Sequence, residues 1–399
     1  MTSFRIDAAP LELLQQALPR LLSNLSIARA QIAIDQIRAS IDTQSIDRIT
    51  FLRAIDSPPA RPESKPDSTS GEDQSQPQES PDHWLAAVIA IQQSDGPDAS
   101  SDMATIVHAG DFDLAAPAET DEQAADLTSD PKPEPLMAEL SQSLDQELSG
   151  RGIRFVQWAT DATSTADTTL PRWCQGLGFQ SIGTLDYMNL DLGEAKADRS
   201  NRDPADHSDG EDRLAFNALP DSQPSLTFTP LDWDSPHELT EFARLVERTY
   251  EETLDCPKLA SFRTAEQTLK GYQSSTAFDP STWFRICDPH DHVVGCLVLG
   301  RHHDAQTPSP DPSSSVTEIV YMGLTIDARG KGYGAHLVNH ANRLVAEFGG
   351  HRIILAVDQA NQPARTLYQR FGFQRMLTET VWVKRLASAS EEKHSDARS

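Results

Sequence analysis

The stretch RGKGYG, residues 329–334, decides the fold of this chain. A hydrophobic run over residues 319–326 precedes it and predicts a buried strand. Apolar residues then recur at helical spacing over residues 335–348, which predicts a helix. Glycines allow successive backbone N–H groups to converge on one point, and a helix N-terminus favours negative charge. The pattern therefore predicts an anion site, to which Arg329 adds a forked, charge-assisted contact.

Taken alone, this turn has two interpretations: a phosphate-binding loop, or a tight strand-to-helix turn without a ligand. It is not a Walker loop, because no Gly-Lys-Ser/Thr ends it. The dinucleotide-binding fingerprint also fits poorly, because no acidic residue closes a second strand at the expected distance. The choice between the two interpretations depends on the sequence that follows.

A second strand–turn–helix unit follows the first. Residues 352–357 are apolar and predict a strand, and residues 364–371 predict a short helix. Asn361 can cap that helix, Pro363 suits its first turn, and Gly372 supplies a left-handed residue at its end. These three residues explain the turns structurally, whether or not a ligand binds there.

Together the two units resemble the acetyl-CoA core of the GNAT superfamily of N-acetyltransferases. That family carries Arg/Gln-x-x-Gly-x-Gly/Ala after its fourth strand and Asn-x-x-Ala-x-x-Leu-Tyr-x-x-x-Gly-Phe after its fifth. The matching residues here are Arg329-x-x-Gly332-x-Gly334 and Asn361-x-x-Ala364-x-x-Leu367-Tyr368-x-x-x-Gly372-Phe373, at the family's usual separation. The resemblance covers roughly residues 226–386 and implies an α/β (α+β) fold, with a mixed, mostly antiparallel central sheet flanked by helices.

The other parts of that fold are predicted in the right order. Residues 236–250 predict an amphipathic helix, and residues 283–287 and 293–299 predict a strand pair joined by a strong turn signal. A polar loop rich in Pro and Ser follows at residues 301–315, and a strand at residues 378–385 closes the sheet.

The first half of the chain repeats the second in order and spacing. Residues 154–159 parallel residues 352–357, and LPRWCQGLGF at residues 170–179 parallels ARTLYQRFGF at residues 364–373. We therefore predict two tandem domains of one fold, with chance similarity as the alternative. The predicted division is a degenerate GNAT-like domain at 1–192 with disordered acidic insertions at about 57–82 and 111–135, a flexible linker at 193–225, a catalytic GNAT domain at 226–387 and a disordered tail at 388–399.

The two copies differ where chemistry would occur. No Arg-x-x-Gly-x-Gly follows Gly110, and the acidic residues of 111–135 would repel a pyrophosphate. Position 174 holds Cys where the second copy has Tyr368. We interpret the first domain as a partner that has lost cofactor binding.

Composition restricts the setting of the protein. The chain has 399 residues, enough for two cores, and 60 acidic against 34 basic residues give a formal net charge of −26. Such an acidic balance argues against nucleic acid as a partner. No apolar run approaches membrane-spanning length and no signal-peptide pattern opens the sequence, so we expect a cytoplasmic protein without a membrane partner. The 4 cysteines show neither metal nor disulfide spacing, so no metal is expected.

The resemblance implies acetyl transfer, in which an amine loses a proton and attacks a thioester carbonyl. Alkylammonium groups have a pKa of about 10, so a base or a water relay is needed at neutral pH. We predict Glu318 as that base, because it lies on the strand before the glycine turn, where this family often carries a carboxylate; a solvent-facing strand carboxylate is the alternative, and Asp358 is the fallback base. Strand alternation predicts Glu318, Val320 and Met322 on one face and Tyr321 on the other.

The resemblance also implies the remaining roles. Tyr368 matches the family's general acid, which protonates the departing thiolate of coenzyme A; ordinary helix packing is the alternative. In this family the strand end before the turn bonds the pantetheine arm like an added strand, and backbone N–H groups near Leu324 could stabilise an oxyanion. The predicted cofactor-binding residues are Leu324, Thr325, Ile326, Arg329, Gly330, Lys331, Gly332, Tyr333, Gly334, Ala335, Asn361, Ala364 and Tyr368.

The acceptor is expected over the first helix of the second domain and the loop after it. Glu251 and Asp255 could receive a cationic group, with Tyr250 as a wall of the site; a helix end followed by a turn explains the same residues without a ligand. Cys256 is a weaker candidate for an acyl-carrying nucleophile, because no His partner lies at recognisable spacing.

We therefore predict an N-acetyltransferase that uses acetyl-CoA as co-substrate and acts by direct transfer in a ternary complex. The acceptor is a small-molecule or peptide amine. Because mycothiol synthases have a similar tandem architecture, an amine on a sugar or thiol cofactor is one option. A different class stays open, a non-catalytic acyl-CoA sensor or scaffold on the same fold. The sequence gives neither the acceptor's identity nor the oligomeric state.

Overall fold

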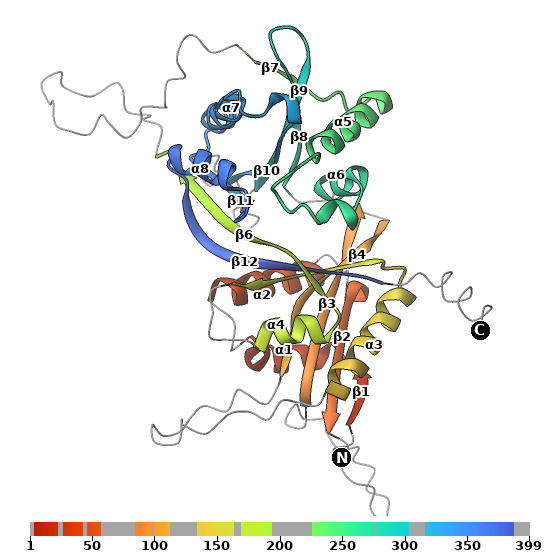
Figure 1. The fold of residues 1–399 in the computed structure, drawn as a ribbon. Coiled ribbons are helices and arrows are strands. Elements are labelled where there is room, and N and C mark those ends of the chain that lie inside the picture. Colours follow the sequence, from red (N-terminus) through yellow and green to blue (C-terminus); the bar gives the residue numbers. More distant parts are fainter. Residues whose placement is uncertain are drawn as a thin grey trace, which may run out of the picture. The chain divides into compact units, whose positions relative to one another are not determined.

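The computed structural model describes residues 4–22, 27–42, 46–56, 84–96, 99–111, 134–162, 169–193, 226–273, 277–302 and 316–386, drawn as coloured ribbon in Figure 1. Predictions for 57–82, 194–225, 303–315, 388–399 and most of 111–135 concern residues outside this set. The described residues form two compact units. The first comprises Met1–Ser94, Ala99–Ser181 and Val381–Ser399, and the second Asp95–Asp98 and Ile182–Thr380.

In the first unit, neighbouring strands follow the chain. They are β1 (Phe4–Ala8), β2 (Ile49–Asp56), β3 (Trp84–Gly96), β4 (Ala99–Asp111) and β5 (Phe155–Asp161), with helices α1 (Glu12–Leu21), α2 (Ile27–Asp42), α3 (Glu134–Gly150) and α4 (Thr169–Gly176). β1, β2 and β3 pair antiparallel, whereas β4 and β5 are parallel and are connected through α3. One core lies under α1 and α2 and another under α3 and α4, so helices cover both faces of this sheet.

The second unit has the same architecture. Its sheet runs β12 (Gln374–Arg385), β6 (Gln180–Asp191), β11 (Arg352–Asp358), β10 (Val316–Leu324), β9 (Val293–His302), β8 (Phe278–Cys287) and β7 (Thr227–Pro230). Its helices are α5 (Pro236–Thr249), α6 (Ala265–Gln273), α7 (Tyr333–Glu347) and α8 (Gln362–Arg370), with one-turn helices η5 (Leu259–Ser261) and η7 (Ile326–Ala328). The predicted helices and strands are confirmed, except that the strand predicted to reach residue 326 ends at Leu324, where the chain turns into η7.

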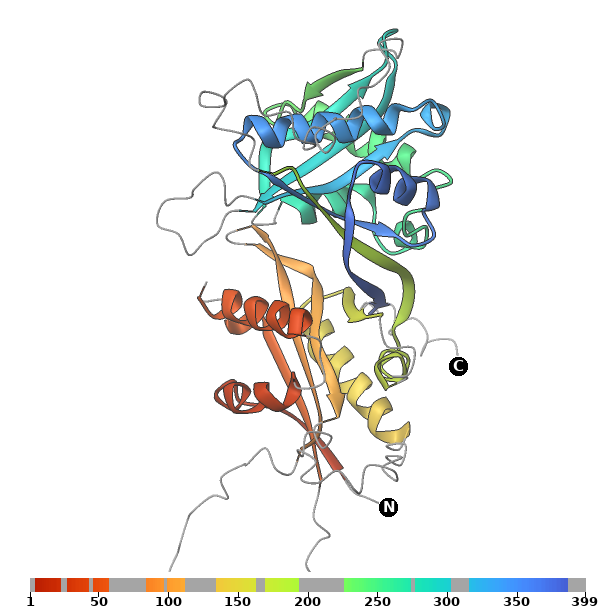
Figure 2. The same cartoon turned by 90° about the vertical axis from the view of Figure 1, so that its left-hand side faces the viewer.

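Opposite faces of the second sheet are covered by different helices. α5 begins where the Ser235 side chain accepts the Glu238 N–H at 3.3 Å, with a proline in its first turn. Its apolar face, including Phe242 and Val246, packs with α6 on Trp283. α7 lies across the other face, as Figure 2 shows, and packs there with α8. Both sheets are mixed, mostly antiparallel and flanked by helices, which confirms the predicted fold class.

The last strand of each half of the sequence enters the other compact unit, β6 for most of its length and β12 only at its end. β6, which ends the first half, lies in the second unit and pairs antiparallel with β11 along the whole of β11. There the Leu192 N–H donates to the His351 carbonyl at 2.7 Å. Correspondingly, the end of β12 lies in the first unit, where the Leu386 N–H donates to the Arg154 carbonyl at 2.9 Å. The boundaries predicted at 192 and 226 stay a prediction about the two sequence copies, because the compact units include these exchanged strands.

Candidate active site

β10 and β11 begin side by side and then part. Their parallel pairing runs from Val316 to Ile319 on β10, and the register contains no further pair in the described length of the two strands. β11 stays paired with β6 on its other edge, and β10 stays paired with β9 as far as Leu324. The edge of β10 that follows Ile319 on the β11 side therefore offers its backbone groups to an extended ligand, as sheet edges do.

A bulge in β10 changes which side chains share a face. The register with β9 shifts between Ile319 and Tyr321, so Val320 is the extra residue. As a result Tyr321 lies with Val320 on the face covered by α5 and α6, and Met322 lies with Ile319 on the face covered by α7 and α8. The predicted alternation, with Met322 on the face of Glu318 and Val320 and Tyr321 on the other, is wrong beyond the bulge.

The glycine turn has the backbone that its sequence requires. Gly330 and Gly332 have φ angles of +74° and +80°, in the left-handed region that side chains with a Cβ disfavour. Gly332 is the N-cap residue of α7, and the first N–H groups of a helix have no intrahelical acceptor. Gly334 approaches α8 so closely that a Cβ would lie 2.9 Å from Leu367. A helix N-terminus entered through such a turn fits a phosphate group.

Arg329 has a structural task in this turn. Its Nη2 donates to the Thr249 carbonyl at 2.9 Å, its Nη1 to the Glu252 carbonyl at 3.0 Å, and its Nε to the Leu324 carbonyl at 3.2 Å. The guanidinium thus joins the end of α5, the loop after it and the end of β10. A cation is favourable there, because the last carbonyls of a helix carry partial negative charge. A phosphate contact by Arg329 stays a prediction.

The second predicted turn positions α8. The Asn361 side chain accepts the Ala364 N–H at 3.3 Å, and Gly372 has a φ of +88°, as the cap and stop signals predict. Tyr368 is 6% exposed and packs on Phe373 with ring centroids 5.5 Å apart. Burial raises the pKa of the Tyr368 hydroxyl, and the nearby Asp255 carboxylate raises it further. Tyr368 therefore keeps its proton at neutral pH.

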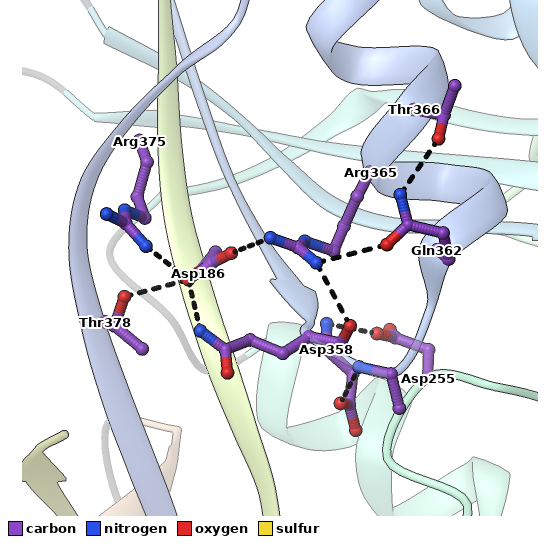
Figure 3. Close-up of polar contacts among 10 residues, drawn as sticks. Asp186, Asp255, Asp358, Gln362, Arg365, Thr366, Arg375 and Thr378 are labelled. Carbon is purple, nitrogen blue, oxygen red and sulfur yellow. Dashed lines mark hydrogen bonds and ion pairs between the residues drawn. The ribbon is translucent and has the colours of Figure 1, made fainter.

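Two carboxylates meet at the end of β11. Asp255 Oδ1 accepts the backbone N–H of Asp358 at 2.8 Å, and Asp358 Oδ2 accepts the N–H of Cys256 at 3.1 Å (Figure 3). Although Asp255 as a residue is exposed, its carboxyl group faces protein, and burial followed by the charge of Asp358 raises its pKa. Burial and the same two carboxylates raise the pKa of the Cys256 thiol, which argues against Cys256 as a nucleophile.

Glu318 has a partner that the sequence did not indicate. Its Oε2 lies 2.7 Å from Nε2 of His302, the last residue of β9, and the two side chains are 32% and 40% exposed. Through this contact His302 orients the Glu318 carboxylate. The pair lies on strands that lead toward the parting of β10 and β11.

Tyrosines from three elements gather on the α5/α6 face. The Tyr321 hydroxyl lies 2.6 Å from the Thr249 hydroxyl, and its ring meets Tyr250 edge-on with centroids 5.9 Å apart. Burial raises the pKa of Tyr272, and neighbours including Tyr250 and Glu318 raise it further. The predicted wall residue Tyr250 is therefore one of three, and of these Tyr272 has its pKa raised by the charge of Glu318.

The structure brings most of the predicted site residues together in the second unit. Glu251 is exposed beyond the end of α5, and Lys331 is exposed in the glycine turn. Sequence reasoning missed His302, Tyr272 and Tyr321. Only Tyr321 carried a signal, because it follows the predicted base on the same strand, but the bulge that turns it toward α5 is not readable from alternation.

The parted strands, the glycine-capped helix, and the carboxylate and tyrosine of the predicted site all belong to the second unit. Residues 246–373 match the sequence profile of the Acetyltransferase (GNAT) family. Residues 246–373 are thus similar to the GNAT family, which confirms the resemblance.

Known relatives match about a third of the chain. A mycothiol acetyltransferase of Arthrobacter sp. (strain FB24) is 28% identical over 116 residues, which are 29% of this chain and 34% of that protein. A mycothiol acetyltransferase of Paenarthrobacter aurescens (strain TC1) is 32% identical over 126 residues, 32% of this chain and 37% of that protein. The chain therefore spans about a third of the length of these relatives.

A solved structure resembles the chain over nearly its whole length. It is a GCN5-related N-acetyltransferase from Sphaerobacter thermophilus, 13% identical, with a TM-score of 0.47 and coverage of 96% of both chains. Among the residues that the structure describes, no helix is long and apolar enough to cross a membrane. The same residues contain no group of three or more His, Cys, Asp or Glu placed to hold a metal ion.

Proposed function

We propose that the second unit transfers an acetyl group from acetyl-CoA to a primary amine by direct attack in a ternary complex. The observation that carries this proposal is the parting of β10 from β11 beside a helix that begins at a left-handed glycine. Acetyl-CoA supplies an activated thioester carbonyl and a thiol leaving group. The protein's own residues bind it, orient the amine and move protons.

Three features support acetyl-CoA as the co-substrate. The N–H groups at the start of α7, with Gly330 and Gly332, would hold its diphosphate. The edge of β10 beyond Ile319, on the side of β11, would bond the amides of its pantetheine arm. Asn361 and Ala364 shape the N-terminus of α8, which would flank the same arm.

Glu318 is the proposed base. A protonated amine has to lose a proton before it can attack, and a carboxylate on the acceptor side can accept it directly or through water. Glu318 is ionisable, partly exposed and oriented by His302 at 2.7 Å, so its proton can leave to solvent after each turnover. Asp358 fits this role less well, because both its oxygens already accept backbone N–H groups.

Tyr368 is the proposed acid. Its buried hydroxyl holds its proton at neutral pH and would donate it to the departing sulfur. The ammonium loses one proton to Glu318 before attack and a second proton to water as the amide forms. Tyr368 gives one proton to the departing thiolate and recovers it from water, so that one proton is released per turnover. Backbone N–H groups beside Leu324 would stabilise the charge on the carbonyl oxygen.

The proposed acceptor is a small-molecule amine. Tyr250, Tyr272 and Tyr321 would surround its ammonium group with aromatic faces, and Asp255 would attract its charge. Glu251 can contribute at the exposed rim. The similarity to mycothiol acetyltransferases supports such an acceptor over a peptide amine.

Steady-state kinetics on Glu318→Gln test this proposal, with release of free coenzyme A thiol measured against a panel of amines. We expect kcat to fall by about 100-fold or more while the acetyl-CoA dissociation constant stays within about twofold. A matched control is Glu266→Gln on the exposed first turn of α6, which should change neither. Unchanged turnover in Glu318→Gln excludes it as the base, and acetyl-CoA binding without turnover of any amine favours the non-catalytic sensor instead.

A further inference from the structure

A buried aspartate on β6 joins four segments of the second unit. Asp186 is 2% exposed, and its Oδ1 accepts from the Thr378 hydroxyl at 2.8 Å and from the Gln359 amide at 2.9 Å. Its Oδ2 lies 3.1 Å from Nη2 of Arg365, and Arg375 approaches Oδ1 at 4.0 Å. Figure 3 shows this cluster next to the Asp255–Asp358 contact.

Asp186 is ionised in this cluster. Burial alone would raise the pKa of its carboxyl group, but the hydrogen bonds from Gln359 and Thr378 and the charges of Arg365 and Arg375 outweigh burial and lower the pKa. A buried carboxylate persists only where donors and cations compensate its lost hydration. The negative charge of Asp186 therefore holds its hydrogen-bond and ion-pair partners in fixed positions.

The partners of Asp186 are the residues that orient α8. Arg365 lies three positions before Tyr368, so the two side chains leave neighbouring parts of the helix surface. The Nη1 of Arg365 also donates to the Gln359 carbonyl and to the Gln362 side chain, both at 3.3 Å. Holding Arg365 thus fixes the rotation of α8 about its axis and the turn that carries its cap, Asn361.

β6 also touches the site through its backbone. A Cβ on Gly183 would come 2.7 Å from Asp358 Oδ2 and 3.2 Å from Cys256 Sγ. The Thr184 carbonyl accepts the Gln359 N–H at 2.8 Å. One strand, encoded in the first half of the sequence, therefore supports both the carboxylate pair and the start of α8.

The ion pair between Asp186 and Arg365 has no counterpart at the matching positions of the other sequence copy. Aligned through the two Gly-Phe pairs, Arg365 corresponds to Pro171 and Asp186 to Thr380. Pro171 on α4 and Thr380 on β12 cannot form an ion pair, although the helix and the strand are both present.

We propose that Asp186 is a positioning residue for cofactor binding: by holding Arg365 and Gln359 it fixes α8, and with it Asn361 and Tyr368, in the geometry that acetyl-CoA requires. This inference rests on the proposed function, because it assigns to β6 a role in the site proposed above. The first half of the chain thereby completes the acetyl-CoA site of the second unit.

Two measurements on the full-length chain test this role: calorimetric titration with acetyl-CoA, and hydrogen exchange of the α8 amides without ligand. In Asp186→Asn, which keeps the size but removes the charge, we expect the dissociation constant to rise about tenfold and exchange over Gln362–Arg370 to accelerate, while α7 is unchanged. Arg365→Gln should do the same, and Arg365→Lys should recover part of the loss. Asp191→Asn on the same strand, whose side chain accepts the Gly193 N–H at 2.8 Å, is the control and should match the wild type.

The outcomes separate this inference from the proposed function. Variants that bind like the wild type, with unchanged exchange in α8, overturn the positioning role. A folded wild type that does not bind acetyl-CoA overturns the proposed function, whereas α8 exchange still decides whether Asp186 orders the helix. If Asp186→Asn does not fold, Arg365→Gln decides, because the Asp186 carboxylate then keeps Gln359, Thr378 and Arg375 as partners.

Discussion

The two units have the same order of helices and strands but differ in the side chains that fill their cores. Each half of the sequence runs strand, two helices, three strands, helix, strand, helix, strand. At the positions of Ala356 and Leu367 in the second half, the first half has Trp158 and Trp173, both buried in its core beside α3 and α4. The corresponding core of the second unit contains no tryptophan among the described residues. Large rings thus fill, in the first unit, positions that the second leaves to smaller side chains.

The positions of the proposed acid and of the glycine motif also differ between the two units. Tyr368 in α8 corresponds to Cys174 in α4, whose thiol is fully buried and has its pKa raised by that burial. No glycine motif follows β4, although most of the chain between β4 and α3 lies outside the described residues. The two units thus have the same fold, but the first unit has core residues at the positions where the second unit has the side chains proposed to bind a ligand. This contrast underlies our proposal that only the second unit binds acetyl-CoA.

The largest effect is expected from paired substitutions at the two matching helix positions. Tyr368→Phe removes the proposed acid and should lower kcat by about 100-fold or more, with little change in the dissociation constant of acetyl-CoA. Cys174→Ala, at the matching position in α4, should leave kcat unchanged. Rates of thiol release with the best amine of the panel measure both. Equal rates in Tyr368→Phe and the wild type would remove Tyr368 from the mechanism and leave it as a packing residue.

A smaller effect is expected from adding a methyl group at two left-handed glycines. Gly332 and Gly152 have φ angles of +80° and +78°, so an alanine at either costs about 1–2 kcal/mol of stability. Only Gly332→Ala should also weaken acetyl-CoA binding, by roughly 10- to 100-fold, because it distorts the turn proposed to hold the diphosphate. Calorimetry and thermal unfolding separate the two effects. Equal affinities in the two variants would contradict the assigned turn.

The smallest effect concerns stability and its pH dependence. Because the pKa of Asp255 is raised in the folded protein, folding favours the protonated carboxyl, and ionisation beside Asp358 destabilises the fold as pH rises through that pKa. Asp255→Asn should therefore stabilise the protein by about 0.5–1 kcal/mol at pH 8, the usual size of an interaction between two charges that solvent partly screens. The stabilisation should become smaller as the pH falls toward 4. Chemical denaturation at several pH values measures this. A variant less stable than the wild type at pH 8 would show that the two carboxylates do not repel.

The local units of the fold were predictable, and the pairings between distant segments were not. The strand, glycine turn and helix around residues 329–334 were predicted because periodicity and capping are written in adjacent residues. The place of β6 beside β11 was not, since β6 and β12 follow similar helices and have similar patterns, so either could close either sheet. Non-local register of this kind depends on tertiary packing rather than on the pattern of one strand.

The same limit applies to the site. Glu318, Tyr368 and Asn361 stand in motifs and could be selected from the sequence. His302 could not, because its contact with Glu318 depends on the register of β9 against β10. Asp186 is more remote still, as its partners Arg365 and Thr378 lie 179 and 192 positions away in sequence.

The difference between the two units is tested most directly by calorimetric titration of the full-length, folded chain with acetyl-CoA. We predict binding at one site per chain, with the heat lost or strongly weakened in Gly332→Ala and kept in Gly152→Ala. No heat of binding to well-folded protein, or two equivalent sites per chain, would contradict the assignment of the acetyl-CoA site to the second unit alone.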